Sequence, residues 1–155
     1  LCIVHPSVCI LNTGGIRTSL PEGPVTVRNI FEISPFENSV ALVYIKGDDL
    51  VSVFEHIALR GGEPISGATM IISGGRLVEA KGDGMPVDKN RMYCIVTNSY
   101  LAEGGDGFDI LKRCEKHVDS TMIRDMFIMY IRNMSENNEH IKDPGNVRIT
   151  VTPEK

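Results

Sequence analysis

Three short segments of the sequence carry side chains that could hold a small ligand, and the first is N-T-G-G-I-R at residues 12–17. The glycine pair Gly14 and Gly15 permits positive φ and lets main-chain N–H groups come close to a ligand. Arg17 could clamp a phosphate or carboxylate through two parallel hydrogen bonds. Asn12 offers a donor and an acceptor to the edge of a heterocycle. The alternative is a plain tight turn with an exposed arginine, because the segment matches neither a Walker A loop nor a dinucleotide fingerprint.

The second segment is S-P-F-E-N at residues 34–38. Pro35 fixes the backbone immediately before Phe36, and an aromatic ring in such a loop could stack on a flat heterocycle. The alternative is that Phe36 belongs to the hydrophobic core, which is where a single phenylalanine is usually found.

The third segment is T-N-S-Y-L-A-E-G-G-D-G-F at residues 97–108, where three glycines surround Asp106. Glycine-rich backbone can place this carboxylate in a concave site, and a carboxylate can accept hydrogen bonds from two neighbouring hydroxyls. The segment therefore indicates a ribose site. The alternative is a turn in which the aspartate caps the following helix.

The sequence shows no pattern typical of a catalytic centre. Its four histidines lie far apart, none in H-x-x-x-H or H-E-x-x-H spacing, and there is no G-x-S-x-G elbow. We therefore expect no metal site in this chain. His56, on an expected helix, is interpreted as solvated or hydrogen-bonded rather than as a ligand.

Alternating and helical patterns predict the elements that must position these segments. Strands are expected at residues 1–11, 39–45, 68–73, 76–80, 91–97 and 147–151, with a hairpin turn at Gly74-Gly75. Helices are expected at residues 27–32, 49–59, 108–114 and 120–133, and a loop at residues 99–107. This order lacks strict β-α-β alternation and predicts the α+β class, with mixed sheets flanked by helices.

Several of these helices carry more detailed expectations. Thr26 and Asp48 are expected to cap the first and second helices. The second helix should bury a stripe of Leu50, Val53, Phe54 and Ile57. The helix at residues 120–133 should present an apolar face formed by Ile123, Met126, Phe127 and Tyr130.

Composition limits the classes of function. The 155 residues suit a single domain over 1–155, and 16 basic against 20 acidic residues argue against nucleic acid as a partner. No apolar run reaches the length of a membrane span. Four scattered cysteines predict neither a zinc site nor a disulfide pairing. The start at Leu1 suggests a piece of something longer.

Taken in order, the segments resemble the C-terminal domain of the 5′-nucleotidase and UDP-sugar hydrolase family. The family pattern N-G-G-G-I-R, P-F-G-N, I-x-G-x-x-L and T-N-x-[FY]-L-A-x-G-G-D-G-F is similar to N-T-G-G-I-R, P-F-E-N, I-K-G-D-D-L and T-N-S-Y-L-A-E-G-G-D-G-F here. These motifs span about residues 9–131, almost the whole chain.

The resemblance implies a substrate-binding domain of an enzyme that hydrolyses nucleoside monophosphates. Phe36 and Tyr100 would sandwich the base and Asn12 would hydrogen-bond it. Arg17 would contact phosphate, Asp106 would accept from the ribose hydroxyls, and the backbone of Gly14 and Gly15 would lie against the ligand.

The resemblance also implies partners and a location. A pair of divalent metals, zinc or manganese, would sit on a separate metallophosphoesterase domain, in cis or in trans. This chain lacks the G-N-H-[DE] motif of such a domain, so alone it is expected to be inactive. A periplasmic, secreted or surface location is implied by the resemblance only.

Two positions depart from the family pattern and keep alternatives open. Thr13 replaces a glycine, and Glu37 replaces the glycine that follows Phe36. The chain could instead be a stand-alone nucleoside-binding module, or a structural domain whose pocket is blocked by Thr13 and Glu37.

Overall fold

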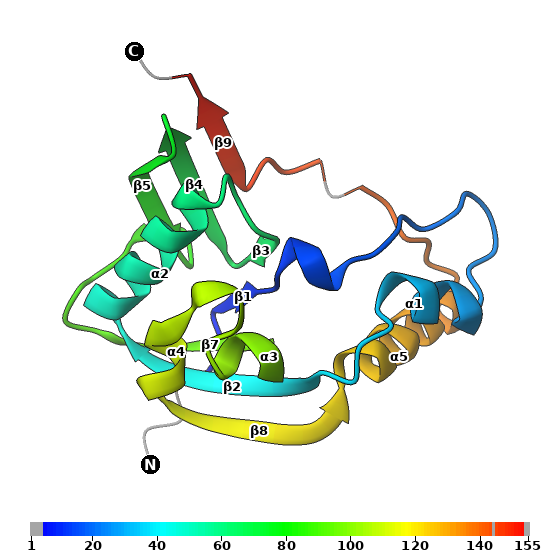
Figure 1. The fold of residues 1–155 in the computed structure, drawn as a ribbon. Coiled ribbons are helices and arrows are strands. Elements are labelled where there is room, and N and C mark those ends of the chain that lie inside the picture. The colour runs from blue at the N-terminus through cyan, green and yellow to red at the C-terminus, as the bar shows by residue number, and fades with distance from the viewer. Residues whose placement is uncertain (1–4, 144, 154–155) are drawn as a thin grey trace.

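The computed structural model describes residues 5–143 and 145–153. Within them lie two mixed sheets and several helices (Figure 1), which confirms the expected α+β class. The strands are β1 (Val8–Ile10), β2 (Ser39–Lys46), β3 (Ile65–Ser66), β4 (Ala68–Ser73), β5 (Arg76–Gly82), β6 (Met85–Pro86), β7 (Met92–Asn98), β8 (Glu115–Met122) and β9 (Ile149–Thr152). The helices are α1 (Val27–Ile33), α2 (Gly47–Leu59), α3 (Ser99–Ala102), α4 (Asp109–Arg113) and α5 (Ile123–Glu136), with single 3₁₀ turns η1 (Thr13–Gly15) and η2 (Gly105–Gly107).

The five-stranded sheet has the order β3-β1-β7-β2-β8. β1 and β7 run parallel, whereas β2 is antiparallel to both of its neighbours, β7 and β8. Alternate residues of β2 point into the core, where Ala41, Val43 and Ile45 are buried. The carboxyl ends of the parallel strands β1 and β7 lead directly into η1 and α3, the segments that carry the ligand-binding candidates.

The four-stranded sheet has the order β6-β5-β4-β9. β4 and β5 form the expected hairpin through Gly74 and Gly75, both of which have positive φ as a tight turn requires. β9 pairs with β4 in parallel, so this late strand of the chain forms one edge of the sheet (Figure 1).

Helix α2 packs against β5 of one sheet and against β2 and β7 of the other. Its expected stripe of Leu50, Val53, Phe54 and Ile57 is fully buried, which confirms the prediction. One cluster of buried side chains draws members from α2 and from both sheets. The C-terminal end of α2 is thereby fixed close to the segments that follow β1 and β7.

Two helix caps hold the candidate segments in place. Thr26 caps α1 as predicted, since its hydroxyl accepts from the Asn29 N–H and the Asn29 side chain accepts from the Thr26 N–H. Asn98 caps α3, its side-chain oxygen accepting from the Leu101 N–H at 2.8 Å. The predicted loop at residues 99–107 is therefore wrong in part, because this cap starts a short helix there.

Asp48 is not the cap of α2 as predicted. The helix begins at Gly47 with Lys46 at the cap position, and Asp48 lies in the first turn. A Cβ atom on Gly47 would meet the Asp88 carbonyl oxygen at 2.0 Å, so glycine is required there by the neighbouring backbone.

The prediction of a helix over residues 120–133 is wrong at its start. Residues 115–122 form β8, an edge strand paired with β2, and α5 begins only at Ile123. The expected apolar face is only half-buried at Ile123 and Phe127, while Met126 and Tyr130 are exposed. In the expected first strand, residues 5–7 are irregular and residues 1–4 lie outside the described residues.

Candidate functional site

All seven side chains and backbone positions singled out from the sequence line one cleft of about 370 Å³. They come from η1, from the segment after α1, and from the segment between β7 and α4. The lining residues are Asn12, Gly14, Gly15, Arg17, Phe36, Asn38, Tyr100 and Asp106. Segments about ninety residues apart in the chain are therefore brought together at one site.

The two aromatic candidates are cleft residues and not core residues. Phe36 is 44% exposed and Tyr100 is 45% exposed. Each ring thus keeps a face or edge available for contact with a flat ligand. The Arg17 guanidinium lies over the Phe36 ring, 5.9 Å from its centroid, and donates to the Gly14 carbonyl at 3.0 Å.

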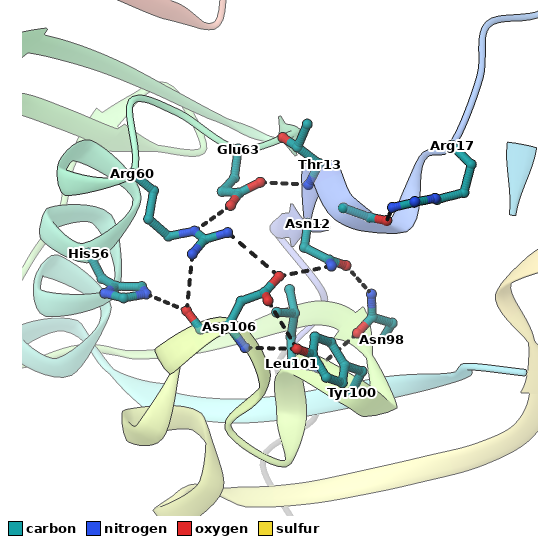
Figure 2. A network of polar contacts seen from close by, with 11 residues as sticks. Asn12, Thr13, Arg17, His56, Arg60, Glu63, Asn98, Tyr100, Leu101 and Asp106 are labelled. Carbon is teal, nitrogen blue, oxygen red and sulfur yellow. Dashed lines mark hydrogen bonds and ion pairs between the residues drawn. The ribbon is translucent and has the colours of Figure 1, made fainter. Parts of the chain in front are cut away.

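Asp106 is the centre of a polar network (Figure 2). Its Oδ1 accepts from the Tyr100 hydroxyl at 2.9 Å, and its Oδ2 accepts from Asn12 Nδ2 at 3.0 Å. Its backbone lies in the left-handed region at φ 53°, between Gly104 and Gly107, which also have positive φ. Asp106 does not cap α4, since the cap position is Phe108; the glycine-rich loop turns the carboxylate toward the cleft.

Asn12 is buried, and both ends of its amide are bonded within the protein. Because a carboxylate only accepts, the Asn12 NH₂ group must face Asp106. Its Oδ1 then accepts from Asn98 Nδ2 at 3.0 Å. Asn12 therefore joins the loop after β1 to the end of β7 and holds the Asp106 carboxylate in place.

Three residues from the C-terminal end of α2 and the segment after it support the same network and were not found from the sequence. Arg60 Nη2 lies 3.6 Å from Asp106 Oδ2, and His56 Nε2 lies 2.9 Å from the Asp106 carbonyl oxygen. Glu63 accepts from Arg60 Nε and from the Thr13 N–H, each at 2.6 Å. The hydrogen bond to Glu63 raises the pKa of Arg60 above its usual value. Only the hydrogen-bonded state of His56 was expected, and that expectation is confirmed.

Two glycines of the site, Gly15 and Gly105, are explained by neighbouring side chains rather than by backbone conformation. Gly14 and Gly15 do not have positive φ, although glycine permits it. A Cβ atom on Gly15 would lie 2.9 Å from Asn12 Oδ1, and one on Gly105 would lie 2.5–2.6 Å from three atoms of the Tyr100 ring. Glycine at these positions leaves space for the side chains that build the cleft.

The two departures from the family pattern lie outside the cleft wall. Thr13 sits in the 3₁₀ turn without positive φ, with its N–H bonded to Glu63. Neither Thr13 nor Glu37 lines the cleft, whereas Asn38 does. Among the described residues the Asn38 amide has no hydrogen-bond partner, which leaves it available to a ligand. Its position in P-F-E-N, two residues after Phe36, was the available signal.

The described part of the chain holds no group of three or more histidine, cysteine, aspartate or glutamate side chains placed to bind a metal ion. In the same residues, no helix combines the length and apolar character needed to cross a membrane. The site is a cleft lined by polar and aromatic side chains.

Comparison with known proteins places these features in a family. The model of the family described as "5′-nucleotidase, C-terminal domain" matches residues 3–113. A 5′-nucleotidase of Diplobatis ommata is 31% identical over 81% of this chain and 27% of its own length. An apyrase of Tabanus yao is 32% identical over 72% of this chain and 24% of its own length. The chain thus spans about a quarter of these relatives.

Solved structures share the fold. A 5′-nucleotidase precursor from Thermus thermophilus superimposes with a TM-score of 0.85 at 25% identity, covering 94% of this chain and 31% of its own. The Haemophilus influenzae NAD nucleotidase gives a TM-score of 0.79 at 20% identity, covering 97% of this chain and 30% of its own.

Proposed function

The chain belongs to the family of 5′-nucleotidase C-terminal domains, and from that membership we propose that its cleft binds the nucleoside part of a nucleotide for hydrolysis elsewhere in the protein. The ligand class is a nucleoside or nucleoside monophosphate. The base preference is left open, since the stacking surfaces accept any flat heterocycle.

One observation carries this proposal: a single cleft gathers two half-exposed rings, an arginine and a carboxylate. These groups match the three parts of a nucleotide. Aromatic rings stack on a base, a carboxylate accepts from sugar hydroxyls, and a guanidinium pairs with phosphate.

The proposed role of each residue follows from the surface that it exposes to the cleft. Phe36 and Tyr100 offer ring surface to the base. Asp106 is a quarter exposed at its side chain and faces the sugar. Arg17 is exposed and contacts the phosphate, while the backbone of Gly14 and Gly15 lies along the ligand.

The hydrogen bonds in the cleft lead us to propose different roles for its two asparagines, Asn12 and Asn38. Because both ends of the Asn12 amide are engaged by Asn98 and Asp106, we propose that Asn12 acts mainly by positioning Asp106. Asn38, whose amide is available, is the better candidate for a hydrogen bond to the edge of the base.

The hydrolytic step is proposed to take place on a metallophosphoesterase domain, in cis or in trans, which would carry the pair of zinc or manganese ions. In support, the matched relatives are longer than this chain, which spans only about a quarter of each of them. A periplasmic, secreted or surface location is part of the same proposal, supported by a relative named as a snake venom 5′-nucleotidase.

Titration calorimetry with adenosine and AMP tests the proposal. We expect both to bind, and we expect Phe36→Leu to weaken binding by about 1–3 kcal/mol through loss of base stacking. Phe31→Leu is the matched control, because Phe31 is 46% exposed but lies on α1, outside the cleft.

The control should bind adenosine like the wild type. Folded wild-type protein that gives no heat with any nucleoside or nucleotide would refute a binding role. Equal losses in Phe36→Leu and Phe31→Leu would place the ligand away from this cleft.

A further inference from the structure

The Tyr100 hydroxyl is bonded twice to the same residue. It donates to Asp106 Oδ1 at 2.9 Å and accepts from the Asp106 backbone N–H at 3.2 Å (Figure 2). The second bond directs the hydroxyl hydrogen away from the main chain and toward the carboxylate. Tyrosine at this position therefore places its own hydroxyl on an acceptor that the cleft offers to a ligand.

The other carboxylate oxygen is also engaged. Oδ2 accepts from Asn12 Nδ2 and lies 3.6 Å from Arg60 Nη2. Both of these partners are fixed, Asn12 by burial and Arg60 by its bond to Glu63. Of the donors on Asp106, the Tyr100 side chain is the one that lies on the exposed cleft wall.

We propose that the Tyr100 hydroxyl competes with the sugar hydroxyls of the ligand for Asp106 Oδ1, and so reduces the preference of the cleft for ribose over sugars that lack the vicinal hydroxyls. This inference rests on the proposed function, since it concerns the sugar end of the same ligand. It assigns to the hydroxyl of Tyr100 a role separate from that of its ring.

The ring and the hydroxyl can be separated by substitution. The ring is seated against Gly105, where even a methyl group would come within 2.5–2.6 Å of it. Phenylalanine fits the same seat and keeps the aromatic face, while it frees Oδ1. Tyr100→Phe should therefore strengthen binding of a ribonucleoside and leave binding of a dideoxynucleoside almost unchanged.

The experiment measures Kd for adenosine and for 2′,3′-dideoxyadenosine with the wild type and with Tyr100→Phe. Selectivity is the Kd for dideoxyadenosine divided by the Kd for adenosine. We expect Tyr100→Phe to raise it roughly two- to tenfold, the range that corresponds to one net hydrogen bond. Tyr130→Phe, on α5 and outside the cleft, is the matched control and should leave selectivity unchanged.

If both ligands bind and selectivity in Tyr100→Phe stays the same or falls, this inference is overturned while the proposed function stands. If neither protein binds either nucleoside, the proposed function fails and the inference fails with it. A crystal structure of the wild type with adenosine is a second test that needs no variant. A sugar hydroxyl on Oδ1 with the tyrosine hydroxyl displaced supports competition, and an intact Tyr100–Asp106 bond beside a bound ribose overturns it.

Discussion

At the scale of single residues, the carboxylate of Glu63 lies in the interior beside the cleft, and its side chain is only 2% exposed. One oxygen accepts from Arg60 and the other from the Thr13 N–H. One charged group, Arg60, and one backbone donor, the Thr13 N–H, thus depend on this single side chain, which connects the end of α2 to the loop after β1.

Removing this carboxylate should therefore destabilise the protein. We expect Glu63→Ala to lower the free energy of unfolding by about 1–3 kcal/mol, because it leaves the Thr13 N–H and Arg60 without their acceptor. Urea denaturation followed by circular dichroism measures the change. Glu55→Ala, at an exposed position of α2, is the control and should stay within about 0.5 kcal/mol of the wild type. Equal effects of the two changes would show that the buried contacts of Glu63 carry no net stability.

The sequence predicted the residues that line the cleft better than those that support them. Phe36, Tyr100 and Asp106 belong to motifs whose composition already indicates their chemistry. Arg60, Glu63 and Asn98 act through partners 46, 50 and 86 positions away, so their roles exist only once the chain is folded. The motif P-F-E-N placed Asn38 near Phe36, but the place of Asn38 in the cleft is seen only once the chain is folded.

At the scale of elements, α5 contrasts with α2. α2 buries six residues, whereas no residue of α5 is buried, and Met129 and Tyr130 on it are 65% and 66% exposed. Its packing against α1 includes the Arg124 guanidinium 4.0 Å from the centroid of Phe31. The two helices should therefore contribute very differently to stability.

We expect Met129→Ala in α5 to change the free energy of unfolding by less than about 0.5 kcal/mol, as for other surface positions. Ile57→Ala in α2 should cost about 2–5 kcal/mol, since it removes a fully buried side chain from the core. Both can be measured by urea denaturation of this chain. A large loss in Met129→Ala would mean that this face of α5 is covered in solution.

The error over β8 has a physical cause. As an edge strand it is mostly exposed and polar, so its sequence, E-K-H-V-D-S-T-M, lacks the alternation that marks a half-buried strand. β8 is held as a strand by its backbone pairing with β2, and not by a hydrophobic pattern of its own. Buried strands such as β2 and β4 were predicted almost to the residue, because burial imposes the pattern from which they are recognised.

At the scale of the whole molecule, the fold class followed from the order of elements, but the sheet topology did not. The parallel pairs β1–β7 and β4–β9 join segments about eighty residues apart. Such pairings are specified by the common core, and no local signal encodes them.

The proposed division of labour makes a prediction at this scale. If the metals belong to another domain, this chain supplied with Zn²⁺ or Mn²⁺ should bind AMP but release no phosphate from it. A colorimetric phosphate assay measures release, and the calorimetric titration of the same sample shows that the cleft is functional. Phosphate release that persists at constant specific activity through successive purification steps would contradict the proposal.

The left-handed backbone of Asp106 has a consequence for how this position can evolve. Besides aspartate, only glycine and asparagine adopt φ near 53° at little cost. Both are reached from an aspartate codon by one base change, and both discard the negative charge while the loop keeps its shape. Genetic drift here can therefore remove the carboxylate from the cleft in one step and leave an intact fold behind, so that descendants of such a domain would be found well folded without this acidic group.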